Sequence, residues 1–126
     1  MNWLDKLYEL GNGDTTKNAF DVLDVHLYCQ KEDSDEIWSW GISSYSDSAP
    51  ELVSRKLDNI RSVMAKYGDG DKPIISTECG FQTSDVDNFA SKTTYETHRD
   101  YAVRLYTLMI AQGVREAWWY NFHDDG

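Results

Sequence analysis

One carboxylate in this chain lies where an enzyme could use it. Glu78 comes near the end of an apolar run, KPIISTECG at residues 72–80, which is typical of a buried strand closed by glycine. An acid carried to a strand end can serve as a nucleophile or as a general acid or base. Two other strand-like runs end in side chains that can hydrogen-bond to a ligand or stack on it: His26 and Tyr28 in the first, Trp119 in the last. The sequence therefore predicts one site built from three strand ends, with Glu78 as its catalytic residue.

Alternating helices and strands must position these residues. Apolar residues at helical spacing, each series followed by glycine, predict helices over residues 3–10, 50–67 and 95–112. Short runs of branched and aromatic residues predict strands over 20–28, 73–79 and 114–122, and long polar loops leave the first two. This order implies parallel strands joined by right-handed crossovers. In such α/β proteins the loops after strand ends hold the chemistry.

Alternation of side chains gives each predicted strand a polar face and an apolar face. The polar faces hold Asp24, His26 and Tyr28; Ser76 and Glu78; and Ala117, Trp119 and Asn121. The helix-facing sets hold Val25 and Leu27; Ile75; and Trp118 and Phe122. Helices on one side and polar groups on the other are typical of a barrel lumen, whereas a doubly wound sheet is apolar on both faces. The predicted fold is α/β, a partial barrel of about three parallel strands.

Composition narrows the classes of partner. The 126 residues suffice for one domain with a core. A net charge of -10 argues against a nucleic-acid surface, which needs clustered Lys and Arg. No apolar stretch has the length of a membrane span, and residues 1–6 do not resemble an export signal. Cys29 and Cys79 are expected to be ordinary thiols, with a bridge between strand ends as the alternative. His98, His123, Asp124 and Asp125 lack metal-ligand spacing, so neither a metal nor a cofactor is expected.

Together, three motifs resemble clan A of the glycoside hydrolases, retaining enzymes built on the (β/α)8 TIM barrel. KPIISTECG is similar to the nucleophile motif of the clan's seventh strand. DVHLY at 24–28 resembles its sixth-strand His-x-Tyr, and AWWYNF at 117–122 its eighth-strand tryptophan segment, most like family thirty-nine and cellulase-like members. The similarity spans nearly the whole chain, from a fifth helix to an eighth strand. It implies that residues 1–126 are the C-terminal portion of a catalytic barrel.

The resemblance also implies a role for each candidate residue. Glu78 would attack the anomeric carbon of a sugar, and the Tyr28 hydroxyl would hold its carboxylate. His26 would point at the sugar or at the second acid, and Trp119 would stack on a pyranose ring. Plainer readings stay open: Glu78 as a strand-end acid paired with a cation, His26 as structural, and Tyr28 and Trp119 as core residues. In the first loop, Trp38, Trp40 and Tyr45 could extend a sugar cleft or anchor the loop.

The departures from the clan matter as much as the match. Its Asn-Glu-Pro acid/base motif is absent from these residues, as are strands one to five and the last helix. A retaining glycosidase needs two carboxyl groups, and this chain supplies one of them. We therefore expect it to be inactive alone, and to act on a glycoside or an oligo- or polysaccharide only with the missing N-terminal half of the barrel. The alternatives are a non-catalytic α/β carbohydrate-binding or interaction domain, or an acidic α/β protein with no ligand.

Overall fold

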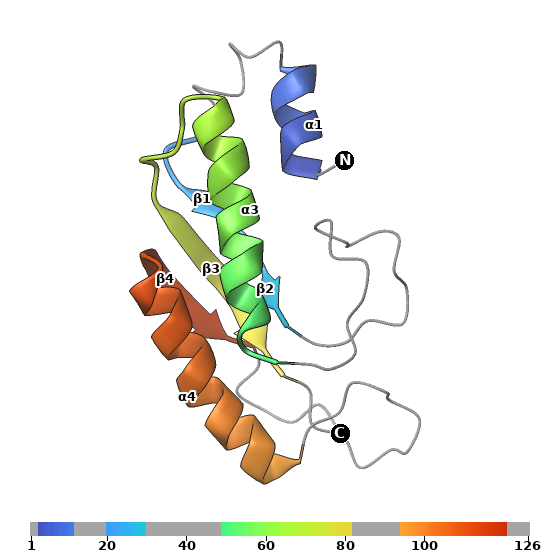
Figure 1. Ribbon diagram of the computed structural model, residues 1–126, viewed down its shortest axis with the longest axis vertical. Helices are drawn as coiled ribbons and strands as arrows, with labels where there is room; N and C mark the ends of the chain where they lie inside the picture. Colours follow the sequence, from blue (N-terminus) through green and yellow to red (C-terminus); the bar gives the residue numbers. More distant parts are fainter. Residues whose placement is uncertain (1–2, 12–19, 30–48, 82–93, 121–126) are drawn as a thin grey trace.

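The computed structural model describes residues 3–11, 20–29, 49–81 and 94–120 of the chain. These residues form three helices and four strands, shown in Figure 1. In chain order they are α1 (Trp3–Leu10), β1 (Leu23–Asp24), β2 (Leu27–Tyr28), α3 (Leu52–Lys66), β3 (Ile74–Gly80), α4 (Tyr95–Ala111) and β4 (Val114–Trp119). The predicted alternation is confirmed, with the first strand split into β1 and β2. Trp38, Trp40, Tyr45, Asn121, Phe122, His123, Asp124 and Asp125 lie outside the described residues.

The strands pair in parallel, as the sequence predicted. The central strand is β3: β1 pairs with its first residues, β2 with its last, and β4 runs along its other edge. Tyr28 is the partner of Gly80, and Trp119 is the partner of Cys79. Because parallel strands point the same way, their C-terminal ends lie together at one end of the sheet. This end carries Tyr28 and Glu78.

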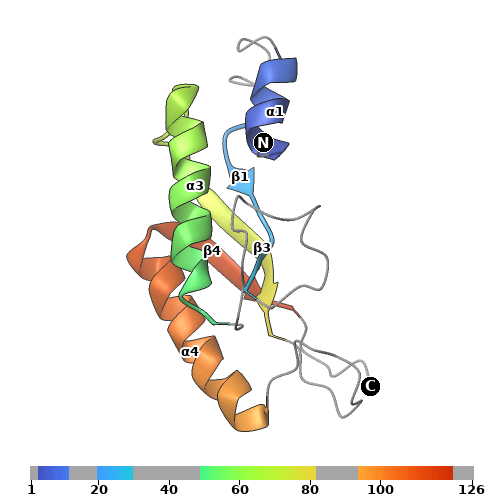
Figure 2. The same ribbon diagram turned by 45° about the vertical axis from the view of Figure 1, so that its right-hand side comes forward.

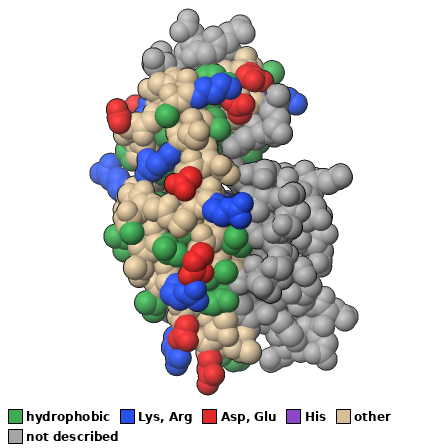
Figure 3. All heavy atoms as spheres, viewed as in Figure 1, with side chains coloured by type: hydrophobic (Ala, Val, Ile, Leu, Met, Phe, Trp, Pro, Cys, Tyr) green, Lys and Arg blue, Asp and Glu red, His purple; other side chains and the backbone are tan. Residues whose placement is uncertain are grey.

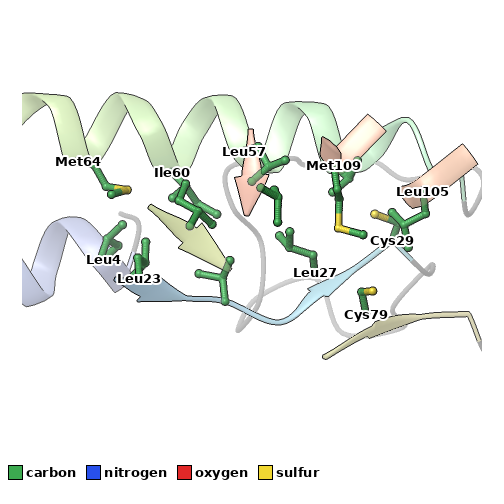
Figure 4. Close-up of a cluster of buried hydrophobic side chains, with 14 of the residues drawn as sticks. Leu4, Leu23, Leu27, Cys29, Leu57, Ile60, Met64, Cys79, Leu105 and Met109 are labelled. Atoms are coloured by element: carbon green, nitrogen blue, oxygen red, sulfur yellow. The ribbon is translucent and has the colours of Figure 1, made fainter. Parts of the chain in front are cut away.

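Helices α3 and α4 lie on the same side of the sheet in both ribbon views (Figures 1 and 2). The inward stripe of α3 is fully buried at the spacing the sequence predicted: Val53, Leu57, Ile60 and Met64. The side chain of Thr94 accepts a hydrogen bond from Thr97 N at 3.2 Å and so caps the start of α4. After α4 the chain turns at Gly113, whose φ of 72° favours glycine. The core between helices and sheet is shown in Figure 4.

A bulge in β3 changes which side chains face the helices. From Asp24 to Leu27 the chain takes three steps while β3 takes four, from Ile75 to Cys79. On the other edge, one residue of β4, Trp118, lies opposite two of β3, Thr77 and Glu78. Both neighbours thus locate one extra residue in β3 before Cys79.

Burial follows the bulge and corrects two expectations. Ile74, Ser76 and Cys79 are fully buried, whereas Ile75 and Glu78 are partly exposed. The prediction that Ser76 shares a face with Glu78 is therefore wrong, and so is the prediction that Ile75 faces the helices. Regular alternation does hold along β1 and β2, where Val25 and Leu27 are buried.

The helical face of the molecule mixes both signs of charge. In Figure 3, Lys and Arg side chains alternate with Asp and Glu over the helices, with apolar groups between them. Binding of a nucleic-acid phosphate backbone needs clustered Lys and Arg side chains, and on this face the cations are interspersed with acids. Within the described ranges, no helix combines the length and the apolar content that a membrane crossing requires.

Candidate active site

Glu78, Tyr28 and His26 meet on the sheet face opposite α3 and α4. The Tyr28 hydroxyl donates a hydrogen bond of 2.8 Å to Oε2 of Glu78. Nδ1 of His26 lies 3.2 Å from the same oxygen. The three side chains come from β2, from the residues between β1 and β2, and from β3. The sequence predicted this grouping and the tyrosine donor, and the structure brings them together.

The carboxylate of Glu78 is reachable from solvent. The exposed fraction of its side chain is 33%, and that of His26 is 53%. Both contacts are made to Oε2, so Oε1 is the oxygen that no side chain of the described residues engages. A carboxylate held by one oxygen and open at the other can attack an electrophile or exchange a proton.

The local environment keeps Tyr28 a hydrogen-bond donor. Burial raises the pKa of its phenol well above the ordinary range, and the hydrogen bond to Glu78 raises it further. The phenol of Tyr120 adds a smaller effect in the same direction. Tyr28 therefore keeps its proton throughout the physiological pH range and donates it to the carboxyl group of Glu78.

A buried lysine anchors the backbone of Tyr28. Lys56 lies on the inner side of α3, with 9% of its surface exposed, and its ammonium donates to the Tyr28 carbonyl oxygen. Cys29, which follows Tyr28 in the sequence, is fully buried, and so is Cys79. Both cysteines have free thiols. Figure 4 shows both sulfurs among apolar side chains. The strand end behind the site is thus fixed from the helix side.

The two tryptophans of β4 lie opposite to expectation. The Trp119 ring contacts two rings of α4, with centroids 5.0 Å from His98 and 6.1 Å from Tyr106. Trp118, which was expected to pack, is 59% exposed. The placement of Trp119 among α4 side chains gives no support to its predicted part in sugar binding.

Sequence reasoning missed two aromatic residues on the site's face. Alternation along β4 sets Trp118 and Tyr120 opposite to Trp119, and they are 59% and 53% exposed. The cause is a second irregularity: Ile74 pairs with Val114 but Ile75 with Glu116, so β4 gains one residue before its tryptophans. The adjacent aromatic residues were a signal that one of them had to face outward.

The polar residues nearest the site have structural partners. Asp24 accepts hydrogen bonds from the Thr77 amide at 3.1 Å and from its hydroxyl at 2.7 Å. The Ser76 hydroxyl donates to the Glu78 carbonyl oxygen at 2.8 Å. No three His, Cys, Asp or Glu side chains in the described part of the chain gather closely enough to hold a metal ion.

The simplest alternative reading of Glu78 expects a lysine or arginine partner. Among the described residues, its carboxylate instead contacts a phenol and an imidazole. The chain matches no protein-family model, and no curated protein matches it.

Proposed function

We propose that this chain is the C-terminal portion of the (β/α)8 catalytic barrel of a retaining glycoside hydrolase, which cleaves O-glycosidic bonds with Glu78 as nucleophile. The observation that carries the proposal is the contact of Glu78 with Tyr28 and His26 at the C-terminal end of the central strand. A parallel sheet with α3 and α4 on one side supports it, since a segment of such a barrel has this arrangement.

In the first step, Oε1 of Glu78 attacks the anomeric carbon and the glycosidic C–O bond breaks. The leaving oxygen takes a proton from a second carboxylic acid, which the missing N-terminal half of the barrel would supply. Water then gives a proton to the second carboxylate and attacks the anomeric carbon, which releases the sugar and returns the Glu78 carboxylate. Tyr28 holds Oε2 in place during both steps, and an imidazole of His26 that carries its proton on Nδ1 can donate to the same oxygen.

The test exploits the missing acid. Dinitrophenyl 2-deoxy-2-fluoro glycosides carry a leaving group that departs without protonation, and their glycosyl esters accumulate. We expect a panel of these reagents to label Glu78, read by peptide mass spectrometry, while unactivated glycosides are not hydrolysed. Glu78→Gln should abolish the label, and Glu96→Gln, an exposed acid on α4, should keep it. Absence of label with every sugar, or label that survives Glu78→Gln, contradicts the proposal.

A second function is favoured by one specific observation, the exposure of Trp118 and Tyr120 on the face that carries Glu78. Exposed aromatic rings beside hydrogen-bonding side chains suit a non-catalytic carbohydrate-binding domain. Titration of oligosaccharides into Glu78→Gln separates the two functions. A binding domain that uses Glu78 as a ligand loses affinity, whereas a glycosidase keeps its affinity and loses only the covalent label.

A further inference from the structure

We propose that Asp24 and Ser76 are positioning residues that hold the bulge at Thr77 and Glu78 and thereby turn the Glu78 carboxylate toward Tyr28 and His26. That Asp24 and Ser76 hold the bulge does not depend on what the protein does. The effect on the reactivity of Glu78 rests on the proposed function.

Without the bulge, Glu78 would face the wrong way. Strict alternation along β3 sets residue 78 on the same side as Ile74 and Ser76, which are fully buried against the helices. A lone carboxylate there would be severely desolvated. The extra residue reverses the alternation, so that Cys79 enters the core and Glu78 leaves it. Aiming a side chain is a recognised use of bulges beside active sites.

Three hydrogen bonds fasten the bulge at its two residues. A bulge interrupts the strand ladder, so its backbone groups need other partners. Asp24 receives both the amide and the hydroxyl of Thr77, at 3.1 and 2.7 Å, and so clamps the bulge from β1. Ser76 donates to the Glu78 carbonyl oxygen at 2.8 Å from within the core. One anchor thus acts from each side of the sheet.

Loss of an anchor has a signature that general destabilisation lacks. Cys79 is buried only because the bulge precedes it, whereas Cys29 lies on a regularly alternating segment and is buried without it. When the bulge loosens, Cys79 loses its cover and Cys29 keeps it. Global unfolding exposes both thiols together.

The experiment measures iodoacetamide alkylation of Cys79 relative to Cys29 in the native full chain, by peptide mass spectrometry. We expect Asp24→Asn and Ser76→Ala to raise this ratio about tenfold, the order expected when one partner of a hydrogen bond is removed. Asp58→Asn, an exposed acid on α3, is the matched control and should leave the ratio unchanged. Thr77→Val should reproduce the rise, and Thr77→Ser, which keeps the hydroxyl, should restore the wild-type ratio.

An unchanged ratio in Asp24→Asn and Ser76→Ala overturns the proposal, and so does equal acceleration at both thiols. The fluoroglycoside label provides the functional arm, since a loosened bulge should slow labelling of Glu78 in the variants whose ratio rises. If wild-type chain takes no label while the ratio still responds, the glycosidase proposal fails and the positioning role stands. If label forms equally fast in wild type and variants, the positioning role fails alone.

Discussion

The hydroxyl of Tyr28 and the carboxylate of Glu78 are joined by a hydrogen bond of 2.8 Å across 50 positions of sequence. The bond links the ends of two neighbouring parallel strands, since Tyr28 pairs with Gly80, two residues after Glu78. It fixes Oε2, while no side chain in the described part of the chain contacts Oε1. The relationship is what distinguishes Glu78 from an ordinary solvated acid at a strand end.

Removing this hydroxyl should disorient the nucleophile. We predict that Tyr28→Phe slows labelling of Glu78 by a 2-fluoroglycoside about tenfold to hundredfold, because hydrogen bonds to charged groups contribute on that scale. The measurement is the rate of adduct formation by mass spectrometry. Tyr95→Phe changes a tyrosine that is 65% exposed on α4 and should label at the wild-type rate. Equal rates in the two variants would remove Tyr28 from the mechanism.

Alkaline pH should destabilise the fold through its two thiols. Burial raises the pKa of Cys79 to about 11 and that of Cys29 to about 12, from an ordinary 9.0. Between the ordinary pKa of 9.0 and the raised pKa of each thiol, the unfolded chain has lost a proton that the folded chain retains. The free energy of unfolding therefore falls as pH rises through this range. The limit is about 1.4 kcal/mol per pH unit for each thiol. Tyr8 and Tyr28, whose pKa values are also raised, act in the same direction at still higher pH.

Urea denaturation at about pH 8 and about pH 10 measures this slope. Cys79→Ala and Cys29→Ala lower stability at every pH because each leaves a gap, so the informative quantity is the slope with pH. It should flatten in each variant. A slope equal to that of the wild type in both variants would mean that other groups govern the alkaline loss.

The consecutive strands β1 and β2 show what sequence can predict about the site. Asp24, His26 and Tyr28 share a face because every second residue there, from Leu23 to Cys29, is buried. Here the polar pattern and the pairing agree, so alternation alone is sufficient. The stripe of α3 was predictable for the same reason, since helical periodicity is a local property.

The last two strands show where sequence reasoning failed. A bulge is defined by how a strand pairs with neighbours far away in sequence, so no local pattern specifies it. The apolar pattern fitted strict alternation in both strands. Ile75 and Cys79 are four positions apart, and so are Val114 and Trp118, so each pair could be buried on one face without an inserted residue. The pairing of β3 with its two neighbours, and not the residue types, decided that Ile74 and Trp119 face the helices instead.

Gly80 should not tolerate a side chain. A Cβ at this position would lie 2.6 Å from the carbonyl oxygen of Tyr120, a backbone atom that cannot rotate away. We predict that Gly80→Ala lowers the free energy of unfolding by about 1–3 kcal/mol, because β3 and β4 must separate locally. Gly70→Ala is a milder control, since its Cβ would lie 3.3 Å from the Ala65 methyl group. Equal costs in urea denaturation would contradict the close approach.

Lys56 holds the end of β2 behind the site through the backbone of Tyr28. Its buried ammonium donates to the Tyr28 carbonyl oxygen, so Lys56→Met leaves that oxygen without its donor at similar side-chain volume. We predict a loss of about 1–3 kcal/mol in the free energy of unfolding, together with slower labelling of Glu78, because Tyr28 loses its anchor. Arg55→Met, on the exposed side of α3, is the matched control and should change neither quantity. A stable Lys56→Met variant with wild-type labelling would show that the Tyr28 backbone is held without the lysine.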